Sequence, residues 1–552
     1  MIVFDAWIFV IKEREVIVNK KIEIEKGIFI PTAIILLGVI LFGFVFNDFF
    51  NTTMTFLFNA VTDWTGWFMM IGSVVMVVAC LIVCFTPLAS KRVGGPSAKV
   101  EYSNFAWISM AICSGIATAV VFYAVGEPIT YFHNPPVWWN IDPETPEAVV
   151  RAISQSQFHW GFIYYGIFTF WGLIAGYMIY NHNLPPRPSS AFYPLLKDKV
   201  FGPIGKVIDV LSLLALIGGM VTSLGFGVQQ FASGLDYVFG IKPSNLIYIA
   251  TLLLVTISYT VSSGRGVKKG MAIISSTNTY IYIFLIAFLF LLGDTVFELK
   301  LLTASIGQQI IDFIPNVFSL DPTNEGQGWF QGWTVFYMAW ITAYAPLIGC
   351  FLAKISKGRS WRSYLLVNIF CPAAFVTVWF VAFGGNAIFQ DLFNGASIGA
   401  EVAEKGIPIA NYALLNLMPL KGLTIPIVVA ALFFSFITLA DAMTGTIAAI
   451  TVKRITEDEA PVRIKFFWGI LCGVTTFLCL FCLGSTGTTS LQNMSIVYAL
   501  PIYILTFISL PCLWRMCDGT VDREIKALTP QQRESLANGA PIGPMPQEES
   551  TE

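Results

Sequence analysis

Charged residues and histidines are scarce in this sequence. Asp, Glu, Lys and Arg make up 12% of its 552 residues, roughly half the share of a soluble domain. Its three histidines, His133, His159 and His182, are isolated, and no His/Cys/acid cluster of a metal or catalytic site is recognisable. The sequence therefore predicts neither an enzyme nor a metal site, and we expect no cofactor.

Nucleotide-binding and redox motifs are missing as well. There is no GxxxxGK[ST] phosphate loop and no polar segment long enough for a nucleotide-binding domain, so ATP-driven pumping is not expected. Cys479 and Cys482 form a CxxC, but in an apolar run without a nearby His or acid, which is typical of buried structural cysteines. The net charge of -2 indicates no particular partner, and no nucleic-acid partner is expected.

Long apolar stretches dominate the chain instead. Each is about the ~20 residues that a helix needs to cross a bilayer. We predict an all-α integral membrane protein with twelve transmembrane helices, at 29–46, 66–86, 104–126, 157–181, 207–227, 245–262, 271–293, 332–353, 363–384, 423–450, 463–484 and 491–513.

Basic residues indicate the orientation. With the N-terminus inside, 27 of the 32 Lys and Arg residues fall in cytoplasmic segments, as the positive-inside rule requires. We predict a multi-pass protein of the inner or plasma membrane with both termini cytoplasmic. Residues 1–27 mix Lys and Glu and do not resemble a cleaved signal peptide. The membrane domain is predicted at 28–515, and 516–552 as a disordered cytoplasmic tail.

Three features interrupt the apolar pattern. A run of mostly small residues at 113–119 in the third span suits either close helix packing or a substrate path. Glu127 precedes Pro128 near the predicted outer end of that span, where a carboxylate can face water. Asp441 lies well inside the tenth span, so it either serves function or caps an irregular helix. Outside the spans, residues 294–331 have the pattern of an extracellular amphipathic helix.

Aromatic residues form stripes at helical spacing in the fourth and eighth spans. Trp160, Tyr164 and Phe168 share one face, and positions 333, 336/337, 340 and 344 share another. Such stripes suit either core packing or a cage for a methylated ammonium ion, which has no N–H and binds ring faces.

Several motifs resemble the betaine/carnitine/choline transporter family, in consistent order over about residues 28–515. They are Gly332 to Trp340, Phe351 to Arg359, Phe158 to Gly161, Tyr123 to Thr130, Thr222 to Gly225 and Ala440-Asp441. The resemblance implies a LeuT-type fold of two inverted five-helix repeats (spans 3–7 and 8–12), an extracellular amphipathic helix and a homotrimer in the lipid bilayer.

The resemblance also implies the site residues. A small zwitterionic or cationic methylated solute would bind at Trp160, Tyr165, Phe168, Met338, Trp340, Ile341, Tyr344 and Thr130. Coupling or gating would involve Glu127, Asn278, Thr438 and Asp441. Four cage positions depart from the family pattern: its Trp-Ala-Trp-Trp reads Met338-Ala339-Trp340-Ile341 here, and Tyr165 and Phe168 replace a Trp and a Tyr.

Departures at the coupling positions indicate how transport is driven. Leu439, Leu216 and Met220 stand where sodium-dependent members have hydroxyls, as in the sodium-independent carnitine exchangers. Those exchangers carry an Arg where this chain has Asn278. We therefore expect a secondary transporter of betaine, carnitine, choline or a related compound, working by alternating access as a sodium-independent exchanger. A sodium- or proton-coupled symporter and a passive channel are the alternatives.

Overall fold

The computed structural model describes residues 23–116, 119–264, 267–323, 325–326, 328–453, 460–481 and 487–542. These residues fold almost entirely into helices, with two isolated bridges, Ile24–Val452 and Arg92–Ser360. This confirms the all-α class. The longer helices are α2 (Lys26–Val45), α3 (Asn47–Val83), α4 (Asn104–Ile116), α5 (Ala119–His133), α6 (Pro146–Trp160), α7 (Phe162–Gly176), α9 (Pro203–Phe239), α10 (Asn245–Gly264), α11 (Val267–Leu292), α12 (Thr295–Phe318), α13 (Phe336–Ile355), α14 (Trp361–Phe380), α18 (Lys421–Ile450), α19 (Val462–Phe481) and α20 (Gly487–Cys517).

Shorter helices complete the described chain. They are η1 (Pro87–Ser90), η2 (Val137–Trp139), η3 (Tyr177–Asn181), η4 (Pro188–Phe192), α8 (Tyr193–Leu196), η5 (Lys197–Phe201), η6 (Gln331–Val335), η7 (Val381–Gly385), α15 (Asn386–Asn394), α16 (Ile398–Lys405), η8 (Ile407–Ile409), α17 (Ala410–Leu417), α21 (Thr520–Ala527) and α22 (Pro530–Ala537). Three of them, η3, η6 and η7, are π-helical turns joined to membrane helices.

The described residues contain ten helices long and apolar enough to span a membrane, or eleven if one bent pair counts as one span. The chain is thus a multi-pass membrane protein, and the number twelve stays a prediction. The predicted span at 245–262 corresponds to α10, which covers the same stretch of chain.

Two predicted spans are broken rather than straight. The third consists of α4 and α5, bent by 60° at the run of small residues. The fourth breaks at Gly161, between α6 and α7, where the chain folds so tightly that a methyl group on Gly161 would lie 2.4 Å from the Gln157 carbonyl oxygen. Only glycine fits this break, which follows Trp160 directly.

A close crossing of α7 and α13 brings the two aromatic stripes together. At the crossing, a methyl group on Gly172 would lie 2.3 Å from the Gly349 oxygen, and one on Gly349 would lie 2.3 Å from the Gly172 nitrogen. Small residues let membrane helices approach backbone to backbone in this way. The helix pair that carries the predicted site is therefore held at contact distance by two glycines.

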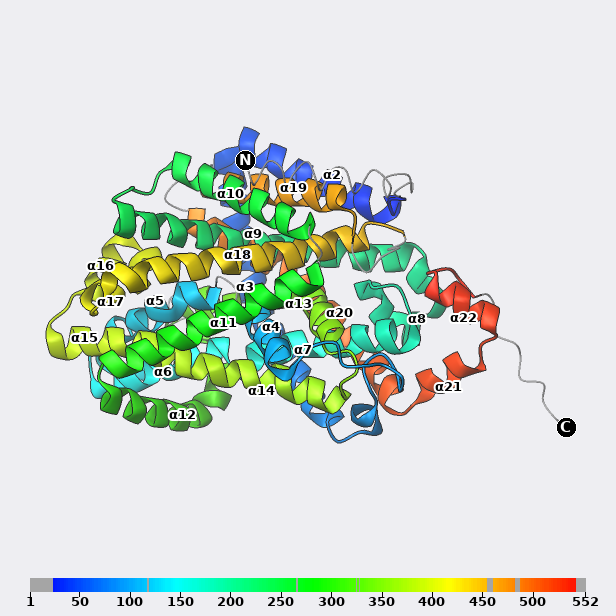
Figure 1. Cartoon of the computed structure of the whole chain (residues 1–552), viewed down its shortest axis with the longest axis horizontal. Helices are drawn as coiled ribbons and strands as arrows, with labels where there is room; N and C mark the ends of the chain where they lie inside the picture. The colour runs from blue at the N-terminus through cyan, green and yellow to red at the C-terminus, as the bar shows by residue number, and fades with distance from the viewer. Residues whose placement is uncertain are drawn as a thin grey trace.

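The segment after the last long helix was predicted to be disordered, but much of it is helical. Residues 520–527 and 530–537 form α21 and α22, which bury Val521, Ile525 and Leu536. Charged side chains dominate this stretch in sequence, whereas its few apolar residues are spaced to share one helix face and pack on the bundle. Figure 1 shows α8, α21 and α22 at one end of the molecule, with α15, α16 and α17 at the opposite end.

Candidate functional site

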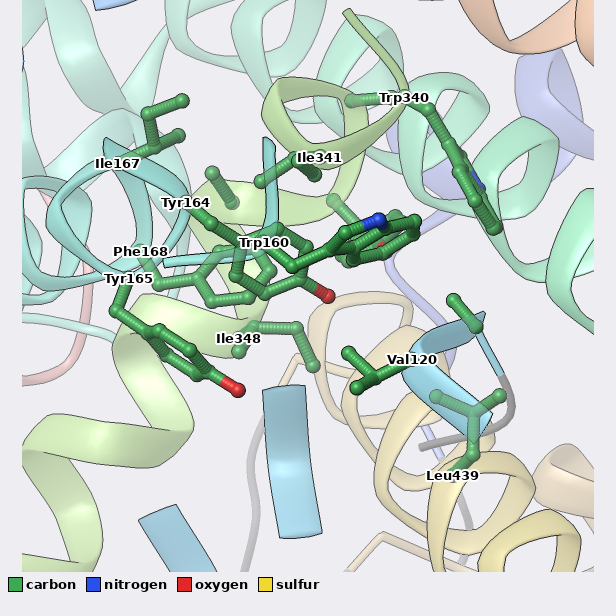
Figure 2. Packing of buried hydrophobic residues seen from close by; sticks show 14 of the residues in the cluster. Val120, Trp160, Tyr164, Tyr165, Ile167, Phe168, Trp340, Ile341, Ile348 and Leu439 are labelled. Atoms are coloured by element: carbon green, nitrogen blue, oxygen red, sulfur yellow. The ribbon is translucent and has the colours of Figure 1, made fainter. Parts of the chain in front are cut away.

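An aromatic cluster forms where α6, α7 and α13 meet (Figure 2). The ring centroids of Trp160 and Trp340 lie 6.0 Å apart with their planes at 86°, and those of Phe168 and Tyr344 lie 5.5 Å apart. All four side chains are at most 4% exposed. The structure therefore brings together the two predicted stripes.

Rings from two further helices join the cluster, and the predicted site residues did not include them. Tyr123 of α5 stacks on Trp160 at 5.5 Å, and Phe226 of α9 meets Trp340 at 5.3 Å. Tyr123 stands in a motif shared with the family, which was the only available signal. Periodicity relates residues within one helix and cannot pair residues that belong to different helices.

Glu127 is the buried anion of this site. It is fully buried, so it does not face water as its place in the sequence allowed. The Trp160 indole donates to Oε2 at 2.6 Å, and His159 Nδ1 lies 2.6 Å from Oε1. Both oxygens of the Glu127 carboxyl group therefore have a hydrogen-bond partner.

The tautomer of His159 follows from its other partners. The Thr334 hydroxyl lies 2.9 Å and the Gln155 amide nitrogen 3.0 Å from His159 Nε2, and both can donate. A tautomer that accepts at Nε2 and donates its Nδ1 proton to Glu127 satisfies the partners on both sides of the ring.

Trp340 is oriented by a backbone contact. Its indole donates to the Gly219 carbonyl at 3.2 Å. A methyl group on Gly219 would lie 2.2 Å from Cδ1 of Tyr344, so α9 contacts both aromatic residues of α13 through one glycine. Both tryptophans thus have their polar edge bonded and their ring faces inside the cluster.

The remaining predicted binding residues occupy different places. Tyr165 is buried, and among the described residues its hydroxyl has no hydrogen-bond partner. Ile341 is buried near Trp160 (Figure 2). Met338 is buried, and its carbonyl accepts from Tyr503 of α20 at 2.9 Å. Thr130 lies about one turn beyond Glu127 and donates to its own helix at the Gly126 carbonyl, at 2.6 Å.

Three of the four predicted coupling residues gather around α18, whereas Glu127 lies in the aromatic cluster. Asn278 of α11 donates to Ser435 Oγ and to the Tyr282 hydroxyl, each at 2.9 Å. Thr438 donates to carbonyls of its own helix, including that of Ser435 at 2.9 Å. Asp441 is 5% exposed. These three residues belong to α11 and α18. None of their hydrogen bonds given above reaches Trp160 or Trp340.

A cavity lies beside the coupling residue Thr438. Its lining comes from α4, α11, α13 and α18: Met110, Cys113, Ser114, Ser275, Ile348, Phe351, Thr438, Leu439 and Ala442. Hydroxyls of Ser114, Ser275 and Thr438 are its polar groups, and no charged side chain lines it. The lining is therefore mostly apolar, with three hydroxyl groups and no charge.

Lys465 of α19 is a buried cation that the sequence analysis counted with the cytoplasmic residues. It is 3% exposed, and a methyl group on Gly445 would lie 3.8 Å from its Nζ. Gly445 follows Asp441 by one helical turn, so the ammonium group lies near the helix face that carries the acid. A charge count along the chain cannot distinguish a loop lysine from one buried between helices.

Comparison with known proteins gives a consistent result. The family model described as BCCT, betaine/carnitine/choline family transporter, matches residues 27–521. A "Probable glycine betaine transporter" of Desulfitobacterium hafniense is 31% identical over 87% of this chain and 95% of its own length. "Glycine betaine transporter 1" of Vibrio parahaemolyticus is 32% identical over 80% of this chain and 83% of its own length. A "High-affinity choline transport protein" of Escherichia coli is 29% identical over 90% of this chain and 72% of its own length.

Proposed function

This chain belongs to the betaine/carnitine/choline transporter family, and from that premise we propose that it is a secondary active transporter of betaine-like quaternary ammonium zwitterions. The solute binds between α7 and α13 and crosses by alternating access. The observation that carries the proposal is the buried Trp160–Trp340 pair, whose rings lie 6.0 Å apart. Each ring face that meets a desolvated ammonium contributes roughly 0.5–2 kcal/mol.

Glu127 supports a cationic headgroup in particular. A carboxylate that accepts from the Trp160 indole increases the negative potential of that ring, and the potential acts strongly where water is excluded. The Tyr165 hydroxyl, which has no hydrogen-bond partner among the described residues, supplies a donor for a carboxylate or hydroxyl of the solute. A choline-like cation and a betaine-like zwitterion both satisfy this chemistry.

The family membership supports a wider set of proposals. They are a LeuT-type arrangement of spans 3–7 and 8–12 as inverted repeats, cytoplasmic termini with a membrane domain at 28–515, and a homotrimer. The basic side chains Lys91, Lys197 and Arg515 contact α21 at one end of the molecule, which fits a cytoplasmic face. Ile310, Ile311 and Ile314 leave an exposed apolar face on α12 for lipid or a neighbouring subunit.

Sodium-independent exchange is the proposed mode. Leu439, Leu216 and Met220 are buried and offer no side-chain oxygen where a sodium ion would need ligands. The Thr438 hydroxyl donates to its own helix, and Asn278 donates from Nδ2 to Ser435 and Tyr282. Among the described residues, Asn278 Oδ1 has no hydrogen-bond partner, so it is one side-chain oxygen that a cation could meet there. A dehydrated cation would find few oxygens to replace its hydration shell.

Counterflow in proteoliposomes tests the transport mode and the coupling together. Vesicles preloaded with unlabelled glycine betaine, carnitine or choline should take up external label faster than empty vesicles, equally in Na⁺, K⁺ or N-methylglucamine buffer and at two pH values. Uptake without trans-stimulation contradicts a carrier and indicates a channel. Loss of uptake without Na⁺ contradicts the exchange mode, and dependence on pH alone points to proton symport.

A further inference from the structure

A buried carboxyl group lies outside the site described above, in the first turn of α12. Glu298 is fully buried, and its Oε1 accepts from Asn386 Nδ2 at 2.7 Å. Asn386 begins α15, directly after the π-helical turn η7. The hydrogen bond therefore joins the α11–α12 corner to the end of the ninth predicted span.

This contact lacks one hydrogen-bond donor. Within the part of the chain that the structure describes, Glu298 Oε2 and Asn386 Oδ1 have no partner. Rotating the amide would not help, because Asn386 Nδ2 also donates to the Ala382 carbonyl at 2.8 Å. A methyl group on Gly293 would lie 2.2 Å from Asn386 Oδ1 and 2.6 Å from Glu298 Oε1, so both groups crowd against this glycine. Two acceptors thus share a tight, buried space.

The surrounding charges do not stabilise an ionised Glu298. Asp294, the N-cap of α12, has the same sign and accepts from Phe297 N at 2.7 Å. The other charged side chains near α12 are Arg151 of α6, which pairs with Glu147 at 3.1 Å; Lys300 of α12 and Asp63 of α3, both exposed; Asp312 of α12, which accepts from Gln308 at 2.8 Å; and Asp391 of α15, which pairs with His133 at 2.9 Å. Burial raises the pKa of Glu298 to about 8, with Asp294 adding to the rise and the Asn386 hydrogen bond opposing it.

We propose that Glu298 is a proton-binding site and that its contact with Asn386 is a clasp, closed on the neutral acid and opened by ionisation. The proton, taken from solvent, supplies the donor that the contact lacks. An ionised carboxylate left in this space would be buried without a cation, which is more costly than leaving the contact for water. The proposal concerns conformation and does not depend on the identity of the transported solute.

The clasp lies beside a segment that touches the helix of Glu127. A methyl group on Gly384 of η7 would lie 2.5 Å from Cγ of Pro128, the residue after Glu127. Opening the clasp therefore releases a turn that packs on α5. This places the proton-binding site next to the helix that orients Trp160, on the face predicted to be outside.

The sign of the pH effect follows from linkage. A carboxyl group with a raised folded-state pKa stabilises the fold fully below its unfolded pKa of about 4.3, and the contribution is lost as pH rises to about 8. Glu298→Gln resembles the neutral acid at every pH, so the variant should not lose this stabilisation as pH rises. The Tm of the variant minus that of wild type should increase by about 2 °C or more between pH 5 and pH 8.5 and stay constant above.

Two controls and a local readout make the test specific. Glu401→Gln, which removes a partly exposed acid on α16, should change Tm by the same amount at every pH. Asp294→Asn should keep the pH effect but move its midpoint to lower pH. Amide exchange in the first turn of α12 should be faster in wild type than in Glu298→Gln at pH 8.5 and equal at pH 5.5. A Tm difference independent of pH, or equal exchange at both pH values, overturns the proposal.

Discussion

At the scale of single residues, one buried acid determines how the aromatic cluster is arranged. Glu127 accepts from Trp160 and from His159, each at 2.6 Å, and all three side chains are fully buried. The charge-assisted hydrogen bond holds the indole in one orientation. Glu127 thereby acts as a positioning residue for the ring that we place against the solute.

We expect Glu127→Gln to weaken binding of a quaternary ammonium solute by roughly 1 kcal/mol, about fivefold, because a neutral amide keeps the contact but not the charge. Trp160→Ala, which removes the ring itself, should weaken binding more. Tryptophan fluorescence or calorimetric titration of the purified protein with glycine betaine and choline measures both effects. Unchanged affinity in Glu127→Gln would show that its charge does not act on the cation.

At the scale of helices, the site depends on a crossing with no room for a side chain. Gly349 meets both the Gly172 nitrogen and the Phe168 carbonyl oxygen, at 2.3 and 2.7 Å from the position of an added methyl group. Phe168 and Tyr344 face each other close to this crossing, with ring centroids 5.5 Å apart. The distance between the aromatic stripes therefore depends on these glycines.

Gly349→Ala should lower the free energy of unfolding by about 1–3 kcal/mol, since α7 and α13 must move apart to admit the methyl group. Solute affinity should fall with it, because the stripes separate. Gly332→Ala in the same predicted span is the control, as nothing lies within 4 Å of its added methyl group. Thermal unfolding in detergent and binding titrations compare the two variants. If Gly349→Ala and Gly332→Ala have the same stability and the same solute affinity, α7 and α13 do not cross in close contact at Gly349.

At the scale of the whole molecule, the C-terminal helices are docked on the end of the bundle that carries many basic residues. Asp522 of α21 accepts from the Lys91 ammonium, and from the Tyr177 hydroxyl at 2.7 Å, and lies 2.9 Å from His182 Nε2. Burial alone would raise the pKa of Asp522, but these partners outweigh it and hold the pKa well below its usual range. One carboxylate thus connects the segment after α20 to the ends of two other helices.

Asp522→Asn should loosen this docking and expose α21 and α22 to protease. Because the pKa of Asp522 is depressed, its contribution is full above the unfolded value of about 3.9 and is lost only under strong acid, so the effect should be constant between pH 6 and pH 8. Limited trypsin digestion, followed by mass spectrometry of cleavage at Arg523, Lys526 and Arg533, measures it. Glu534→Gln, at an exposed position of α22, should be cleaved like wild type.

The sequence determined the class of this protein because bilayer thickness and hydrogen-bond satisfaction act on each apolar segment separately. The helical content and the membrane class could therefore be predicted, and motif resemblance identified the family. Trp160 and Trp340 were identified through helical spacing and motif resemblance, which are properties of one segment at a time.

Only the tertiary structure decided how the segments meet. Burial of Glu127, the added rings of Tyr123 and Phe226, and the helical tail all result from contacts between residues far apart in the chain. The periodicity of one segment carries no information about contacts with other segments. The same holds for the contact between Glu298 and Asn386, which lie 88 residues apart in the chain.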